Sequence, residues 1–208
     1  MNRVKFISIF ILLLISGSAF SQINWDYDLY EQMNHKNFRN NPMFSQTIDF
    51  NNPDLPLLNA TLFFMTNEVR AKKRRKLLDY NKNLEIAAYQ HSKSMVVLNF
   101  YSHINSIQPQ RATPQKRGKF AGIKNPFIAE NIAYADTRSS DTYLEIAEFI
   151  MDLWMKSPNH KSNILSKDAL ELGCGAYFSE NRVFATQNFQ WYEMVIETEA
   201  EDSLPDTK

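Results

Sequence analysis

His160 is the residue whose type and position best suit chemistry, because it lies in Ser157-Pro158-Asn159-His160, directly after an amphipathic stretch. Serine followed by proline favours a new helix, with Ser157 as N-cap and Pro158 at the first helical position. His160 would then lie in the first turn, where the helix dipole lowers the pKa of imidazole and favours the neutral, metal-binding form. The residues alone also allow a plainer interpretation, a surface histidine in a loop.

The sequence before this turn predicts the helix that positions it. Pro158 cannot continue that helix, since proline lacks an amide hydrogen. Three earlier helices are predicted: one from Leu57 to about residue 70, one from about Asn83 to before Tyr101, and one from Thr113-Pro114 toward Gly122. The helix before the turn has apolar residues at the spacing of one buried face, namely Tyr143, Ile146, Ala147, Ile150, Met151 and Trp154.

The C-terminal part changes to the alternating pattern of strands. Residues 170–178 and 182–191 alternate around Ser179-Glu180-Asn181, which predicts an antiparallel hairpin. Both faces of these strands have bulky groups, so we expect helices on both sides of the sheet. The predicted fold class is therefore α+β.

Three residues within these elements could do chemistry but have plainer explanations. His91 lies on the apolar face of its helix, which favours a packed core histidine with one satisfied nitrogen. Cys174, the only cysteine, shares a strand face with Leu172 and Ala176, so we interpret it as a small buried hydrophobe rather than a nucleophile. Gln187 is a polar residue on an apolar face, and its amide either orients a site residue or ties loops together.

Residues 70–76, Arg-Ala-Lys-Lys-Arg-Arg-Lys, form the strongest charge feature of the chain. Cations at the end of the first helix complement the helix dipole and remain solvated, which is a sufficient explanation. Binding of anionic glycans or lipid headgroups is the alternative.

The N-terminus of the chain predicts export. Arg3 and Lys5 precede an apolar run over residues 6–15 and a cleavage pattern ending at Ser21, so residues 1–21 read as a signal peptide. The run is too short to span a membrane, and we expect a secreted or periplasmic protein without a transmembrane segment. Cleavage removes two of 23 basic residues, against 23 acidic ones, so overall charge does not favour nucleic acid.

Two flanking segments surround the predicted domain. Residues 22–53 are polar, with too few apolar side chains for an independent core, and either cap a cavity or trail freely. Residues 193–208 read as an acidic, disordered tail. The domain itself is expected over residues 54–192.

Seven landmarks in sequence order resemble the CAP superfamily, which comprises cysteine-rich secretory proteins, antigen 5 and plant pathogenesis-related proteins, in its bacterial, cysteine-poor branch. The resemblance covers about residues 57–192 and implies a three-layer α-β-α sandwich around a small antiparallel sheet covered by helices. The landmarks are residues 67–70, residues 84–95, Tyr101-Ser102-His103, Pro114 with Arg117 and Gly122, residues 129–133, residues 154–165, and Leu172-Gly173-Cys174-Gly175 with residues 186–189.

The family resemblance implies a central cavity lined by two histidines and two glutamates that holds a divalent metal in some members. Carried over, the histidines correspond to His103 and His160 and the first glutamate to Glu130, which gives a three-ligand Zn²⁺ site. The second glutamate position is Ser157, which departs from the four-residue pattern; a serine there is usual in bacterial relatives, and it removes one carboxylate ligand. We also place Gln187 at this cavity.

Two classes of function follow from this resemblance. The first is a non-enzymatic exported binding module that recognises a lipid, a glycan or a cell-envelope component. The second is a metal-dependent hydrolase of peptides or esters, with Zn²⁺ and an activated water in the same cavity. Glu130 is its candidate catalytic residue, but Glu130 cannot be both metal ligand and general base.

Overall fold

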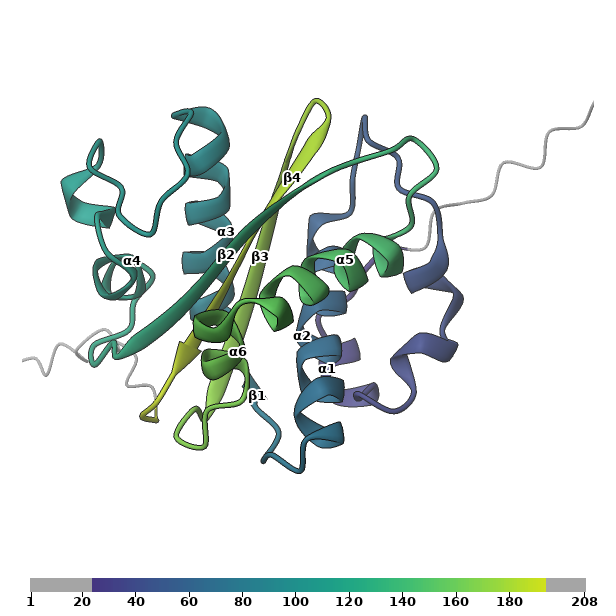
Figure 1. The fold of residues 1–208 in the computed structure, drawn as a ribbon, viewed down its shortest axis with the longest axis horizontal. Helices are drawn as coiled ribbons and strands as arrows, with labels where there is room; N and C mark the ends of the chain where they lie inside the picture. Colours follow the sequence, from purple (N-terminus) through teal and green to yellow (C-terminus); the bar gives the residue numbers. More distant parts are fainter. Residues whose placement is uncertain (1–23, 194–208) are drawn as a thin grey trace, which may run out of the picture.

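The computed structural model describes residues 24–193, so the predicted signal peptide and nearly all of the predicted tail lie outside the described residues. The helices and strands follow the order predicted for the domain, with one additional long strand before the last two helices (Figure 1). The helices are α1 (Leu29–Gln32), η1 (Phe38–Asn40), η2 (Pro42–Ser45), α2 (Leu55–Lys72), α3 (Lys82–Val97), η3 (Pro109–Arg111), α4 (Pro114–Phe120), α5 (Tyr143–Lys156) and α6 (Pro158–Ile164). The strands are β1 (Asp79–Tyr80), β2 (Ile128–Asp136), β3 (Glu171–Ser179) and β4 (Arg182–Gln190).

The sheet has the strand order β1-β3-β4-β2. The predicted hairpin of β3 and β4 is confirmed, with Leu172 opposite Phe189 and Cys174 opposite Gln187. The short strand β1 runs parallel to β3, so the sheet is mixed rather than purely antiparallel. Strand β2 pairs with β4 and forms the other edge of the sheet.

Helices cover both faces of this sheet, which confirms the predicted α-β-α sandwich. Helices α3 and α4 lie on one side, and α2, α5 and α6 lie on the other (Figure 1). Helix α3 lies very close to β3 because Gly173 and Gly175 have no side chains. A Cβ on either glycine would be 2.0 Å from a backbone nitrogen of α3.

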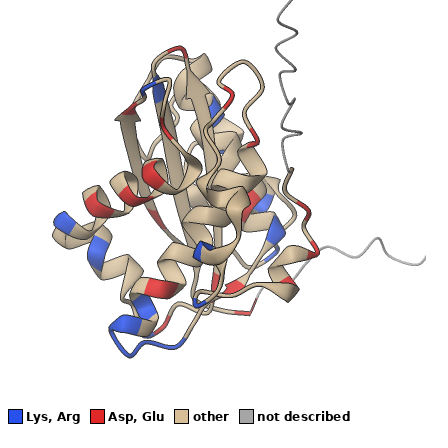
Figure 2. Cartoon of the chain, turned by 90° about the vertical axis from the view of Figure 1, so that its right-hand side faces the viewer, with Lys and Arg blue, Asp and Glu red and all other residues tan. Residues whose placement is uncertain are grey.

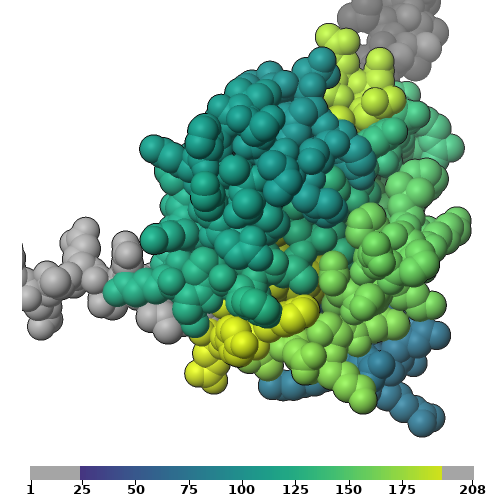
Figure 3. Space-filling model, turned by 60° about the vertical axis from the view of Figure 1, so that its left-hand side comes forward, coloured from purple at the N-terminus to yellow at the C-terminus, as the bar shows by residue number. Residues whose placement is uncertain are grey.

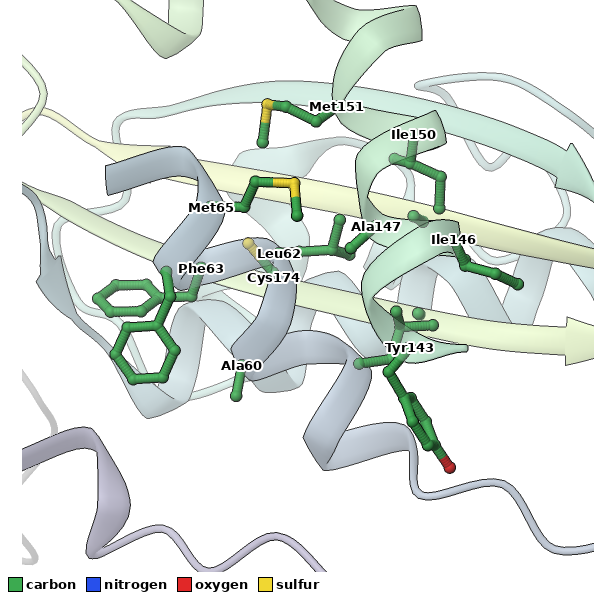
Figure 4. Close-up of a cluster of buried hydrophobic side chains, with 14 of the residues drawn as sticks. Ala60, Leu62, Phe63, Met65, Tyr143, Ile146, Ala147, Ile150, Met151 and Cys174 are labelled. Carbon is green, nitrogen blue, oxygen red and sulfur yellow. The ribbon is translucent and has the colours of Figure 1, made fainter. Parts of the chain in front are cut away.

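Between α2 and α5 lies the main apolar core (Figure 4). Tyr143, Ile150 and Trp154 of α5 are fully buried, as their spacing predicts. Cys174 reaches the same core from β3, and burial raises the pKa of its thiol well above the ordinary value. Cys174 is therefore a small buried hydrophobe, as predicted.

Local capping explains where the site-forming helices begin. Thr142 and Glu145 form a capping box at the start of α5. Pro158 occupies the first turn of α6 after Ser157, as predicted, but the Ser157 hydroxyl makes no capping hydrogen bond. The expectation that this hydroxyl caps α6 is therefore wrong, although the backbone of Ser157 has the extended conformation of an N-cap.

The segment from residue 24 to residue 53 packs on the outer side of α2 and does not trail freely. Trp25, Phe38 and Phe44 are buried and contact the ring of Phe64. The hydroxyl groups of Tyr27 and Tyr30 donate to the buried carboxylate of Glu85 at 3.0 and 3.1 Å. The segment thus completes the core.

None of the described helices is long and apolar enough to cross a bilayer.

Candidate functional site

Glu130 lies on the edge strand β2 and is buried against α4. Its side chain is only 1% exposed. Arg117 Nη2 donates to Glu130 Oε2 at 2.6 Å, and His103 Nδ1 lies 2.9 Å from Oε1. Both carboxylate oxygens are therefore engaged by neighbouring side chains.

Electrostatics keep Glu130 ionised despite its burial. Desolvation raises the pKa of its carboxyl, but the hydrogen bond with His103 and the charge of Arg117 outweigh that penalty and lower the pKa below its ordinary value. Arg117 is equally buried, and its guanidinium also donates to the carbonyls of His103 and Arg111 at 3.1 and 3.0 Å. The pair is consequently a rigid anchor for the loop that contains His103.

His103 and His160 approach each other across the edge of β2. Their ring centroids are 6.5 Å apart. Alternation along β2 explains this placement, because Glu130 faces α4 while the next residue, Asn131, faces α6. His103 comes from the loop beside α4 and His160 from α6, so the two imidazoles flank the strand from opposite layers.

The pKa of His160 is lowered, as predicted, but for a different reason. Desolvation by partial burial is the main cause, and repulsion from His103 adds to it. Neutral imidazole is therefore favoured at His160.

His91 confirms the prediction of a packed core histidine and also lies beside the site. It is fully buried, and its Nε2 is 3.0 Å from the carbonyl of Ser102, while Nδ1 has no partner among residues 24–193. Burial lowers the pKa of His91 to about 4, so it is neutral near pH 7. Its Nε2 is also 3.7 Å from Glu130 Oε1, a proximity that the sequence analysis did not anticipate.

Gln187 lies behind the site rather than in it. Its side chain is fully buried, donates to Thr66 Oγ1 at 2.6 Å and accepts from Asn131 Nδ2 at 3.1 Å. Asn131 Nδ2 also donates to the backbone carbonyl of His160 at 3.0 Å. Gln187 therefore supports His160 through Asn131. This contact both orients a site residue and ties α6 to the sheet, the two roles suggested for Gln187.

An open groove begins at His160 and runs along the exposed part of β2. Ser157 and His160 contribute to a hollow of about 420 Å³, which also has Tyr101, Tyr134 and Phe149 in its wall. Glu130 and His103 do not line this hollow. The structure therefore separates the predicted cavity residues. Ser157 and His160 line the hollow, whereas Glu130 is sealed in an ion pair with Arg117 beside His103.

Aromatic rings extend the groove past the end of β2 into a second hollow of about 650 Å³. Tyr134 packs edge-to-face on Tyr101 with ring centroids 4.9 Å apart and lies 5.7 Å from Phe184. Tyr101 and Tyr134 keep 47% and 43% of their surface exposed. Arg182 lies over the Tyr134 ring at 4.7 Å and pairs with Asp136 at 2.8 Å. We call Tyr101, Tyr134, Asp136, Arg182 and Phe184 the aromatic groove.

The residues do not assemble the three-ligand metal site that the family resemblance implies. Within residues 24–193, no group of three or more His, Cys, Asp or Glu side chains is placed to hold a metal ion. Glu130 is already bound to Arg117, which leaves two imidazoles. Two imidazoles on one tetrahedral Zn²⁺, with Zn–N bonds of about 2.1 Å, have ring centroids about 5 Å apart, so His103 and His160 would have to move closer.

Sequence reasoning missed the charge partner of Glu130. Arg117 is among the residues that carry the family resemblance, but no role was assigned to it. Thirteen positions separate Arg117 from Glu130, and no local motif links them. One weak sequence signal was available: Arg117 is directly followed by Gly118 on a short helix, and a glycine beside it allows the arginine side chain to be buried.

Comparisons with known proteins agree with this architecture. The model of the cysteine-rich secretory protein family, CAP, matches residues 63–189. The uncharacterized protein YkwD of Bacillus subtilis (strain 168) is 28% identical over 125 residues, which are 60% of this chain and 44% of YkwD. The uncharacterized membrane protein YlbC of the same organism is 26% identical over 125 residues, or 60% of this chain and 32% of YlbC. The matched region thus spans less than half of either relative.

Solved structures share the fold. An extracellular protein containing an SCP domain from Bacillus anthracis str. Ames aligns with a TM-score of 0.52 at 25% identity, over 67% of this chain and 42% of that one. The CAP domain of Enterococcal PrgA aligns with a TM-score of 0.50 at 16% identity, over 74% of this chain and 69% of that one.

Proposed function

Because this chain belongs to the cysteine-rich secretory protein family, whose model matches more than half of it, we propose that it is an exported, non-enzymatic binding module. The proposed ligand is a glycan of the cell envelope, bound along the aromatic groove. The observation that carries this proposal is the exposed pair of Tyr101 and Tyr134 beside the polar groups of Asp136 and Arg182.

A glycan fits this combination of groups better than a lipid does. A sugar ring has an apolar face of C–H groups that stacks on an aromatic ring, and hydroxyl groups at its rim that need polar partners. Tyr101 and the part of the Tyr134 ring that stays exposed beside Arg182 offer the aromatic surface, and Asp136 and Arg182 offer an acceptor and donors next to it. An acyl chain would instead need an enclosed apolar wall, whereas this groove is open and edged by charges.

The same geometry disfavours the hydrolase hypothesis. A general base must reach a proton within hydrogen-bond distance and should have a pKa near the working pH. Glu130 is 1% exposed, is bound to Arg117, and has a lowered pKa. It therefore lacks both the access and the basicity that hydrolysis requires.

Binding of the mature chain to purified cell-wall glycan and to a panel of soluble oligosaccharides tests this proposal. We expect Tyr134→Ala to weaken binding at least about tenfold, the effect of losing a stacking contact in the middle of the site. Phe120→Ala is the matched control, because Phe120 is an exposed aromatic residue, 55% accessible, outside the groove.

Equal affinity of Tyr134→Ala and the unmodified chain would overturn the aromatic groove as the binding site. Turnover of a peptide or ester substrate that is lost in Glu130→Gln would overturn the non-enzymatic assignment.

A further inference from the structure

On the far side of α6 lies another hollow, of about 710 Å³, which shares no lining residue with the two hollows of the groove. Figure 3 shows the segments that form it, near residue 75, around α6 and at the end of β4, close together along the lower edge of one face. We call it the basic pocket. It is lined by Arg75, Pro158, Lys161, Ser162, Asn163, Leu165, Ser166, Lys167, Asp168 and Trp191.

The basic run of residues 70–76 begins in the last turn of α2 and continues into the loop that follows it (Figure 2), and Arg75 of this run lines the basic pocket. Arg75 comes from this run, and Lys161 and Lys167 face it from α6 and the following loop. Asp168 is the acidic residue of the lining, so positive charge predominates. Solvation of a helix end explains the exposed lysines of the run, but it does not explain cations gathered from three separate segments around one hollow.

Arg70, the first residue of this run, adds a buried positive charge. It is fully buried and donates only to backbone carbonyls: Nη1 to Ile164 and Ser166 at 2.8 and 2.9 Å, and Nε to Lys76 at 2.8 Å. Burial and the nearby charge of Arg75 lower the pKa of Arg70 to about 10. In the part of the chain that the structure describes, neither Arg70 nor Arg75 forms an ion pair with a carboxylate.

Hydrogen-bond donors without acceptors surround the same place. Arg70 Nη2, Arg75 Nε and Trp191 Nε1 are buried atoms that have no partner among the described residues. Buried donors are normally satisfied, because an unpaired donor loses the hydrogen bonds that it makes with water in the unfolded chain. Unpaired donors and unbalanced cations at one hollow are the arrangement that an oxyanion would complete.

We propose that the basic pocket binds a phosphorylated sugar, with its phosphate between Arg75, Lys161 and Lys167 and its ring against Trp191. Guanidinium and ammonium groups match phosphate oxygens, and the hydroxyl groups of Ser162 and Ser166 offer further donors. The hollow is far larger than a phosphate ion, which leaves room for the sugar beside the half-buried Trp191.

Isothermal titration of the mature chain with glucose 6-phosphate, glucose and inorganic phosphate tests this site in about 0.1 M salt, where charges farther apart than about 10 Å are screened. We expect glucose 6-phosphate to bind best and glucose not to bind. The variant Arg75→Gln/Lys161→Gln should bind at least about tenfold more weakly, since it loses two charge-assisted contacts with the phosphate. This variant keeps Arg70, which the fold requires.

The matched control is Lys119→Gln/Lys124→Gln, which removes two exposed cations elsewhere. Equal loss in this control, or no loss in Arg75→Gln/Lys161→Gln, would overturn the site. Inorganic phosphate binding as tightly as glucose 6-phosphate would overturn the sugar assignment, as would equal affinity for phosphatidylglycerol vesicles. Tyr134→Ala should leave this binding unchanged, so failure of the aromatic groove is distinguishable from failure of the basic pocket.

Discussion

The buried ion pair between Arg117 and Glu130 predicts that Arg117→Met destabilises the fold in a pH-dependent way. The two side chains are 2% and 1% exposed, and their charged atoms are 2.6 Å apart. Methionine fills much of the space of arginine but leaves the carboxylate of Glu130 buried without its cation. Removing one partner of a buried pair costs about 3–5 kcal/mol, so we expect the free energy of unfolding to fall by this amount at pH 7.

The sign of the pH dependence follows from the pKa of Glu130. In the native chain this pKa is lowered, because the hydrogen bond with His103 and the charge of Arg117 outweigh desolvation. The pair therefore stabilises the fold above the unfolded-state pKa of about 4.3, and this contribution is lost as pH falls through the lower folded-state pKa.

In Arg117→Met, desolvation of Glu130 is no longer offset by Arg117, and we expect the pKa of its carboxyl to rise. A carboxyl with a raised folded-state pKa loses stability as pH rises through that value. The stability difference between the variant and the unmodified chain should therefore be large at pH 7 and should shrink toward pH 4.5.

Urea unfolding followed by circular dichroism at pH 7 and at pH 4.5 measures both quantities. Arg182→Met is the control, because Arg182 and Asp136 form the same type of pair at 2.8 Å with 44% and 79% of their side chains exposed. We expect less than about 1 kcal/mol for this control. A deficit for Arg117→Met that is independent of pH, or no larger than that of the control, would refute the reasoning.

Three further predictions concern the packing of the core and the histidine pair. Gly173→Ala should cost more than about 3 kcal/mol in urea unfolding, beyond ordinary overpacking, because its Cβ would meet the α3 backbone at 2.0 Å. A chain beginning at residue 54 should lose at least about 4 kcal/mol, since each large buried side chain in the deleted segment contributes about 1.5–3 kcal/mol; unchanged stability would disprove its structural role. Because His103 and His160 lie too far apart for one Zn²⁺ and Glu130 is bound to Arg117, we expect calorimetric titration to show only weak Zn²⁺ uptake, which either His103→Ala or His160→Ala should abolish. The affinity for Zn²⁺ should decrease as pH falls through the imidazole range, and undiminished uptake by both variants would place the metal elsewhere.

Periodic patterns predicted the parts of the fold that bury one face against a continuous core. Helix α5 is the clearest case, because its apolar stripe and the proline that follows predicted the helix, and the capping box seen in the structure fixes its start. The hairpin of β3 and β4 has similarly consistent alternation. Strand β2 was not recognised, since its buried residues follow one another without alternation and include Glu130 and Asn131, whose burial depends on partners distant in sequence.

The candidate site was less predictable because its properties arise from contacts between layers. Family resemblance named His103, Glu130 and His160, and the structure brings the two imidazoles within 6.5 Å. The family resemblance could not show that Arg117 seals Glu130 from solvent, or that Gln187 lies one layer behind His160. Contacts between side chains of different layers leave no periodic signal in the sequence. The compensation of the Glu130 charge by Arg117 is therefore visible only in the structure.

Helix α6 lies between the two proposed binding surfaces and contributes residues to both, so a movement of α6 would shift both surfaces together. His160 faces the aromatic groove, while the adjacent Lys161 faces the basic pocket. Asn131 fixes the position of α6 on the sheet, since its side chain donates to the His160 carbonyl and accepts from Asn163 at 2.8 Å. A shift of α6 would therefore move both surfaces and break hydrogen bonds of buried groups, each worth about 0.5–1.5 kcal/mol. Rigid support of this kind favours two preformed sites on one helix.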